Sequence, residues 1–155
     1  MINIATYADN LYMQHACVMI QSLSEVLNTN EYYNIFFFYS DCSDSNLKKA
    51  NHTFSNLPPN VQVELIETNF GIKSKLKAKK SFVTSSIYDK ILIYEDLPKD
   101  LNRVLFIDAD VIFEKDPSLL YYIDLEGRLL GAVKEKKYLM NKSDHQDLDV
   151  VDLES

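Results

Sequence analysis

Short apolar segments typical of β-strands alternate along this chain with segments whose apolar residues recur at helical spacing. The strand-like segments are 2–6, 35–40, 61–67, 103–107 and 129–133. Between the first two, apolar residues recur every three or four positions, as on one face of a helix: Met13, Ala16, Cys17, Ile20, Leu23 and Leu27. Asp44 or Ser45 would cap a second helix that ends near Phe54, and a third helix is expected near 85–97. This alternation predicts an α/β fold with a mostly parallel sheet flanked by helices.

Length and charge narrow the kind of protein and its partners. The 155 residues, 46% of them hydrophobic, suffice for one ordinary core. A formal net charge of -7 disfavours binding to nucleic acid, which requires a basic surface. The apolar runs are too short for a transmembrane segment, and two cysteines without CxxC spacing indicate neither a zinc site nor a disulfide framework. We therefore expect a cytoplasmic protein that binds a small ligand or a protein partner.

Two aspartates, Asp108 and Asp110, stand within the apolar run "VLFIDADVIF" at 104–113. The D-x-D triplet alone is a weak signal, because another one, at 147–149, lies in the polar C-terminal segment. The first triplet, however, follows a strand of the kind that is covered on both faces, and ligand sites in open α/β sheets form at the carboxyl ends of strands. In extended backbone, residues i and i+2 point to the same side, so both carboxylates could bind one hard divalent cation. The alternative is a solvated pair at a strand end.

Three stretches of the sequence carry a resemblance to a known family. The stretch "RVLFIDADVIFEKDPSLLYYIDLEGRLLGAV" at 103–133 resembles the metal-binding region of family-8 retaining glycosyltransferases of the GT-A fold, where a strand delivers the D-x-D motif. The N-terminal "IATYADNLYMQHACVMIQSL" at 4–23 is similar to the segment of that family that contacts the nucleotide. A third stretch, "SSIYDKILI" at 85–93, resembles the family's "YxR" helix. The three stretches occur in the family's order.

The resemblance implies a hexosyltransferase that uses a UDP-sugar, UDP-glucose or UDP-galactose, with Mn²⁺ or Mg²⁺ as cofactor. Asp108 and Asp110 would bind the cation together with the diphosphate, and Asp108 would also lie close to the ribose and sugar. Asp9 would accept a hydrogen bond from the uracil ring, and Tyr12 would stack on it. The other nucleotide contacts implied are Asn10, Lys90 and Ala109. Lys90 stands where the family usually has arginine, so the positive charge is kept but the bidentate fork is lost.

The resemblance covers 1–135, which we interpret as a GT-A nucleotide-sugar-binding domain followed by an acidic tail at 136–155. Members of the family continue past the point that matches Val133, with acceptor contacts and a later histidine of the metal site. We therefore expect a C-terminally truncated domain that lacks a third metal ligand and is incomplete or inactive on its own. A homodimer could cover the exposed edge of such a shortened sheet, and a full-length form could lie at the membrane periphery.

Other interpretations compete with this one. The main alternative is a non-catalytic nucleotide- or protein-binding module on the same scaffold. A receiver-type phosphoacceptor with Asp108 as the modified residue would need two adjacent acids after the first strand, where only Asp9 occurs. The segment 73–80 contains five lysines that could face phosphate, but such a cluster is more often a solvated surface. His15 and His52 are expected to be packing or surface residues rather than ligands.

Overall fold

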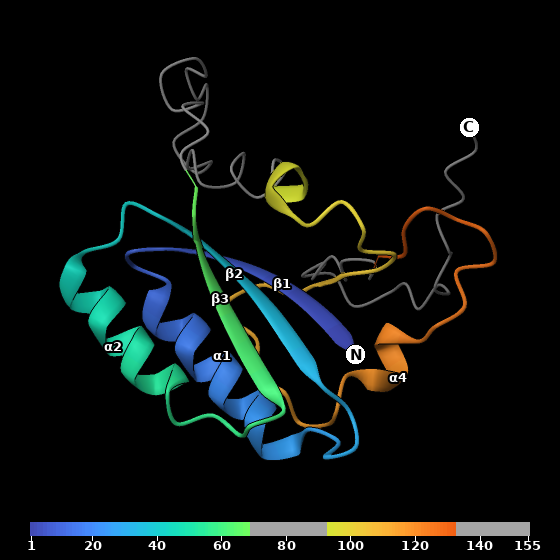
Figure 1. Cartoon of the computed structure of the whole chain (residues 1–155), viewed down its shortest axis with the longest axis horizontal. Coiled ribbons are helices and arrows are strands. Elements are labelled where there is room, and N and C mark those ends of the chain that lie inside the picture. Colours follow the sequence, from blue (N-terminus) through green and yellow to red (C-terminus); the bar gives the residue numbers. More distant parts are fainter. Residues whose placement is uncertain (69–92, 133–155) are drawn as a thin grey trace, which may run out of the picture. The chain divides into compact units, whose positions relative to one another are not determined.

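The computed structural model describes residues 1–68 and 93–132, and within them four strands form one parallel sheet in the order β3-β2-β1-β4 (Figure 1). The strands are β1 (Ile2–Asp9), β2 (Tyr33–Ser40), β3 (Val61–Glu67) and β4 (Leu105–Phe106). The helices are α1 (Met13–Val26), α2 (Asp44–Phe54) and α4 (Ser118–Tyr121). The predicted α/β fold, a parallel sheet flanked by helices, is confirmed.

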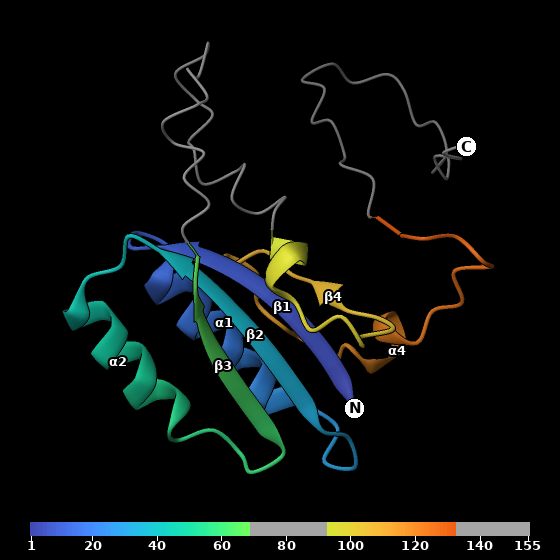
Figure 2. The ribbon, with the colours of Figure 1, turned by 45° about the horizontal axis from the view of Figure 1, so that its top comes forward.

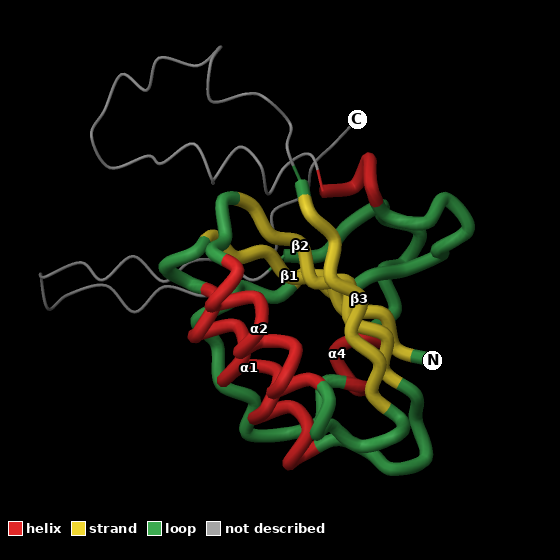
Figure 3. The backbone as a smooth tube through the Cα atoms, turned by 60° about the vertical axis from the view of Figure 1, so that its left-hand side comes forward, coloured by secondary structure: helices red, strands yellow, loops and turns green. Residues whose placement is uncertain are grey.

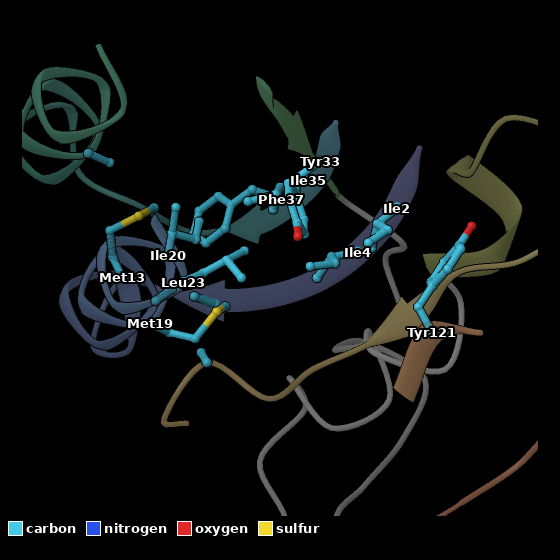
Figure 4. Packing of buried hydrophobic residues seen from close by; sticks show 14 residues of the cluster. Ile2, Ile4, Met13, Met19, Ile20, Leu23, Tyr33, Ile35, Phe37 and Tyr121 are labelled. Carbon is cyan, nitrogen blue, oxygen red and sulfur yellow. The ribbon is translucent and has the colours of Figure 1, made fainter. Parts of the chain in front are cut away.

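One face of the sheet is covered by α1 and α2, which lie side by side (Figure 3). Of the apolar stripe predicted for α1, Met13, Ala16, Ile20 and Leu23 are buried, and Met19, which was not predicted, is buried with them. In Figure 4 the side chains of Ile20 and Leu23 lie next to that of Phe37 from β2, within one buried cluster that also includes Ile35. Burying one large apolar side chain contributes about 1.5–3 kcal/mol, so this layer firmly fixes α1 against the two central strands.

The opposite face of the sheet has its own apolar cluster. Its buried members are Ala5, Tyr7, Phe36, Phe38 and Ile93, and Ile66, Leu97, Leu101 and Val104 pack against them. Residues 93–96 are helical and lie over this face (Figure 2). Because both faces are covered, every residue of β1 from Ile2 to Ala8 is buried. This explains why β1 and β2 have nearly continuous apolar sequences.

The second helix begins where the sequence predicts, but with a different cap. Ser43, rather than Asp44 or Ser45, is the N-cap residue, and its side chain accepts a hydrogen bond from the Asn46 N–H at 3.3 Å. Asp44 is instead the first helical residue, where a negative charge is favourable near the N-terminal end of the helix dipole. The helix ends at Phe54, as predicted.

The fourth strand is shorter and more exposed than the sequence predicts. Only Leu105 and Phe106 pair with β1, although 103–107 was expected to form a strand. The carbonyl group of Arg103 instead accepts hydrogen bonds from the side chains of Asn3 and Tyr121, at 3.5 and 3.2 Å, so it is not available to a strand ladder. Phe106 is 43% exposed, so the expectation of a strand covered on both faces was wrong here.

The strand expected at 129–133 is also wrong over its described part. Residues 129–132 have no strand structure, and the side chain of Leu129 is fully exposed. They follow a turn in which Glu126 and Gly127 both have positive φ angles, and no strand among the described residues pairs with them. An apolar run without a pairing partner does not form a strand. Of the helix expected near 85–97, all but residues 93–97 lie outside the described residues.

The chain divides into two compact units, Met1–Tyr122 and Ile123–Ser155. The sheet, its helices and both apolar clusters belong to the first unit. In the second unit, the described residues contain the turn in which Asp124 Oδ1 accepts a hydrogen bond from the Glu126 N–H at 2.8 Å. A helix with the length and apolar character of a membrane span does not occur in the described parts of either unit.

Candidate functional site

The order of the strands creates a point of divergence between β1 and β4. From β1 the chain proceeds to β2 and then β3 on one side, whereas β4 pairs with β1 on the other side. In open parallel sheets, ligands bind in the crevice at the carboxyl ends of the two strands where the order reverses. Asp9 is the last residue of β1, and Asp108 follows β4 by two residues. The fold therefore brings the two halves of the predicted site to one end of the sheet.

The loop between β1 and α1 is shaped by Asp9. Its Oδ1 atom accepts hydrogen bonds from the backbone N–H groups of Leu11 and Tyr12, each at 3.0 Å. These bonds form a tight turn just before α1, whose N-cap residue Tyr12 makes no capping bond through its own side chain. The Tyr12 ring is 47% exposed and lies 5.5 Å from the His15 ring, measured between centroids. Tyr12 thus has a free ring face available for stacking, and His15 is a surface residue, as predicted.

Asn10 has a structural role that the sequence did not reveal. Its Oδ1 atom accepts hydrogen bonds from the Ser43 N–H at 2.9 Å and from the Asn46 Nδ2 at 3.0 Å, and its backbone carbonyl accepts another from the same Nδ2 at 3.2 Å. Asn10 therefore ties the β1–α1 loop to the N-terminus of α2. A carbonyl oxygen that already accepts two hydrogen bonds has little capacity left for a nucleotide, so a ligand contact from Asn10 would use its Nδ2 or its backbone.

The two aspartates of the D-x-D triplet are exposed, and Ala109 between them is buried. The backbone N–H of Ile107, just before Asp108, still donates to the Ala5 carbonyl of β1 at 2.9 Å. Residues 109 and 110 form a turn, so the alternation of side chains in an extended strand does not describe this pair. Their convergence on one cation thus stays a prediction. Among residues 1–68 and 93–132, no three His, Cys, Asp or Glu side chains are grouped so that they could hold a metal.

The segment after the D-x-D triplet is anchored to the helical side of the sheet. The Phe113 N–H donates to the Ser22 hydroxyl of α1 at 3.0 Å. Three residues later, Asp116 accepts hydrogen bonds from the Asn28 N–H and the Ser118 N–H, both at 2.8 Å, and from the Tyr33 hydroxyl. Burial alone would raise the pKa of Asp116, but these hydrogen bonds outweigh it and hold the pKa below its usual value. Both ends of the turn that bears the aspartates are therefore fixed.

Several polar residues at the same end of the sheet were missed by the sequence reasoning. They are Tyr39 and Ser40 at the end of β2, Cys42 just after it, Glu67 at the end of β3, and Thr68 just after it. Burial, together with the negative charges of Asp9 and Glu67, raises the pKa of the Cys42 thiol to about 11. The sequence did contain a signal for these residues. They lie at or just after the ends of the predicted strands "IFFFYS" and "VQVELIE", and the carboxyl ends of parallel strands lie at the same edge of a sheet. This edge is acidic, so a phosphate ligand would need a cation between itself and the carboxylates.

Several sequence predictions fall on residues that the structure does not describe. Lys90, the predicted nucleotide contact, and the lysine cluster at 73–80 both lie outside the described residues, as does the acidic tail at 136–155. The division of the chain at residue 135 likewise stays a prediction. His52, expected at the surface, is exposed.

The parallel sheet flanked by helices is a fold of the GT-A type, and solved structures of glycosyltransferases match the chain. The galactosyltransferase LgtC, solved in complex with donor and acceptor sugar analogues, superposes with a TM-score of 0.64 at 18% identity over 79% of this chain. Mouse xyloside xylosyltransferase 1 gives a TM-score of 0.56 at 14% identity over 77% of the chain. At these identities the likeness concerns the fold.

A family model then narrows the class. The model of glycosyl transferase family 8 matches residues 3–154, and the chain belongs to that family. Among curated relatives, probable galacturonosyltransferase 13 of Arabidopsis thaliana is 33% identical over 73 residues, which is 44% of this chain and 14% of that protein. Probable galacturonosyltransferase 12 of the same plant is 36% identical over 63 residues. The chain spans 43% of LgtC, so it corresponds to less than half of that solved relative.

Proposed function

We propose that this chain supplies the nucleotide-sugar-binding part of a retaining hexosyltransferase that takes a UDP-sugar with Mn²⁺ or Mg²⁺. The main support is the arrangement at the strand divergence. Asp9 ends β1 and Asp108 follows β4, so both stand at the carboxyl ends of adjacent parallel strands, where open parallel sheets bind ligands. Membership of glycosyl transferase family 8 supports the same function.

The residues after β4 suit a hard divalent cation in their chemistry. Asp108 and Asp110 are exposed carboxylates, which are the kind of oxygen donor that Mg²⁺ and Mn²⁺ prefer. Mg²⁺ usually retains several waters and takes further oxygen ligands from substrate phosphates, so two protein carboxylates are a workable set. When bound, such a cation would neutralise the charge that develops on the departing diphosphate. It would also relieve repulsion between the diphosphate and this acidic edge.

The nucleoside would bind beside the β1–α1 loop. Tyr12 offers an exposed ring face on which uracil can stack, and the Asp9 carboxylate lies within the same loop to accept a hydrogen bond from the base. Asp108 would lie close to the ribose and sugar, and Ala109 would contact the nucleotide through its backbone because its side chain is buried. UDP-glucose and UDP-galactose are the donors to test, and LgtC, named as a galactosyltransferase, makes the second a natural choice.

A calorimetric titration with UDP, with and without Mn²⁺, tests the proposal. We expect Mn²⁺ to strengthen UDP binding in the wild type, and the double variant Asp108→Asn/Asp110→Asn to lose this enhancement because amides do not supply the charge. Asp44→Asn is a matched control, since Asp44 is an exposed aspartate in the first turn of α2 and distant in sequence from the triplet. Metal-dependent binding that persists unchanged in the double variant would place the cation elsewhere.

A further inference from the structure

The β1–α1 loop, residues 9–12, carries Asp9, Asn10 and Tyr12, which are three of the nucleotide contacts proposed above. The two bonds that Asp9 accepts from Leu11 and Tyr12 join neighbouring residues within the loop. The ends of the loop are continuous with β1 and α1, where the Tyr12 carbonyl accepts a hydrogen bond from the Ala16 N–H at 3.0 Å, but these bonds do not fix the middle of the loop, at Asn10 and Leu11, against a third element. Precise placement of Tyr12 therefore depends on an additional contact with a rigid element.

That contact comes from α2. The side-chain amide of Asn46 donates two hydrogen bonds to Asn10, one to its backbone carbonyl at 3.2 Å and one to its Oδ1 at 3.0 Å. The Ser43 N–H donates a third bond to the same Oδ1 at 2.9 Å. The Asn46 backbone N–H in turn donates to the Ser43 hydroxyl that caps α2. One amide group thus bridges residues 36 positions apart in the chain and fixes the loop to the first turn of a packed helix.

We propose that Asn46 is a positioning residue for nucleotide binding: it makes no contact with the ligand, but holds the β1–α1 loop where Tyr12 and Asp9 can engage the base. This inference rests on the proposed function and identifies a residue outside the three stretches that carry the family resemblance. Its two donors match two acceptors of Asn10, which neither a carboxylate nor an apolar side chain can do. The effect on the ligand is indirect and passes through Tyr12.

Asn46→Asp is the informative variant, because it keeps the shape of the side chain but replaces the NH₂ group that donates both bonds with an oxygen that faces the two oxygens of Asn10. Asn51→Asp is the matched control. Asn51 lies in the same helix, and its Nδ2 donates only to the Leu47 carbonyl one turn earlier, at 3.0 Å. Ser43→Ala is a second control, since it removes the side-chain cap of α2 but keeps the backbone N–H that donates to Asn10.

The first measurement needs no ligand, so it separates this inference from the proposed function. Nuclear magnetic resonance order parameters of the Leu11 and Tyr12 amides should fall from about 0.85 to below about 0.6 in Asn46→Asp. They should stay at the wild-type level in Asn51→Asp and in Ser43→Ala. Unchanged order parameters in Asn46→Asp would refute the positioning role. A wild type that does not bind UDP would instead refute the proposed function while leaving this loop measurement valid.

The second measurement is UDP affinity in a double-mutant cycle with Tyr12→Ala. We expect Asn46→Asp to weaken UDP binding about tenfold in the wild-type background, as two lost hydrogen bonds allow, and less than about threefold when Tyr12 is already absent. Asn51→Asp should change affinity by less than about twofold. Equal losses in both backgrounds would show that Asn46 does not act through Tyr12, and undiminished binding by Asn46→Asp would overturn the inference outright.

Discussion

Asp116 joins three segments of the chain through one carboxylate. Its Oδ2 atom accepts hydrogen bonds from the Asn28 N–H and the Tyr33 hydroxyl, and its Oδ1 atom accepts one from the Ser118 N–H. Asp116→Asn keeps the size of the side chain but supplies a single acceptor oxygen, and its NH₂ group would face a donor. A hydrogen bond to a charged group contributes about 1.5–3 kcal/mol, and the partial exposure of Asp116 reduces the contribution of each bond. Summed over the bonds that the variant weakens or loses, we expect the unfolding free energy at pH 7 to fall by about 2–3 kcal/mol.

Urea unfolding of the 155-residue chain measures this loss. Asp124→Asn is the matched control, because Asp124 is an exposed aspartate that accepts one bond from the Glu126 N–H, and we expect it to change stability by less than about 0.5 kcal/mol. Thermal unfolding provides a second reading, since about 2–4 °C per kcal/mol is typical of a chain of this size. Equal losses in the two variants would refute the assignment of Asp116 as a structural junction.

The pH dependence tests whether the charge of Asp116 is the stabilising feature. Its pKa is lowered in the folded state, so its contribution is fully present above the pKa of an unfolded aspartate, about 3.9, and is lost as the pH falls through the lowered value. The stability gap between the wild type and Asp116→Asn should therefore be constant from about pH 7 to 5 and shrink below about pH 4. A gap that remained constant into the acid range would contradict an ionic acceptor.

Four further outcomes are expected. Tyr12→Ala should weaken UDP binding about tenfold to a hundredfold by calorimetry if base stacking holds the uracil, and intact affinity would place the nucleotide elsewhere. Leu23→Ala should cost about 2–5 kcal/mol in urea unfolding, since Leu23 is fully buried beneath the sheet, and a loss under about 1 kcal/mol would contradict that packing. Cys42, whose pKa is about 11, should react slowly with iodoacetamide at pH 7 and faster as the pH rises towards that value; rapid labelling at pH 7 would contradict the raised pKa. Because transfer also needs a positioned acceptor hydroxyl, we expect negligible release of UDP when the chain is incubated with UDP-glucose or UDP-galactose, Mn²⁺ and a panel of sugar acceptors; turnover near 1 s⁻¹, at about the low end for ordinary enzymes, would refute this.

The elements that the sequence predicted well are those whose pattern is local and strong. The apolar stripe predicted from Met13 to Leu27 corresponds to α1, which ends at Val26, and the strand-like segment 61–67 corresponds to β3. The sequence overestimated the length of β4, the strand that precedes the D-x-D triplet. That length depends on whether the Arg103 carbonyl pairs with a strand or with the side chains of Asn3 and Tyr121. That competition involves residues about 100 positions apart and leaves no periodic signal.

The same limit applies to the site. Asp9 and Asp108 could be proposed from short motifs, and the parallel sheet confirms that both stand at the carboxyl ends of adjacent strands. The bond between Asn46 and Asn10 could not be predicted, because an asparagine in the first turn of a helix is common and its partner lies in a different loop. Such a contact depends on the register of β1 and β2, because this register places the β1–α1 loop beside the start of α2.

Both loops that carry the predicted ligand residues are held by the same helical layer. Asn46 of α2 fixes the β1–α1 loop, and Ser22 of α1 accepts a hydrogen bond from Phe113 just after the D-x-D turn. Since α1 and α2 pack against the central strands through a buried core, the described residues that we propose for nucleotide binding all lie in the unit Met1–Tyr122. Binding and transfer should therefore be separable. Variants of Asn46 or Ser22 should alter UDP affinity, whereas acceptor choice should be determined by residues outside this layer.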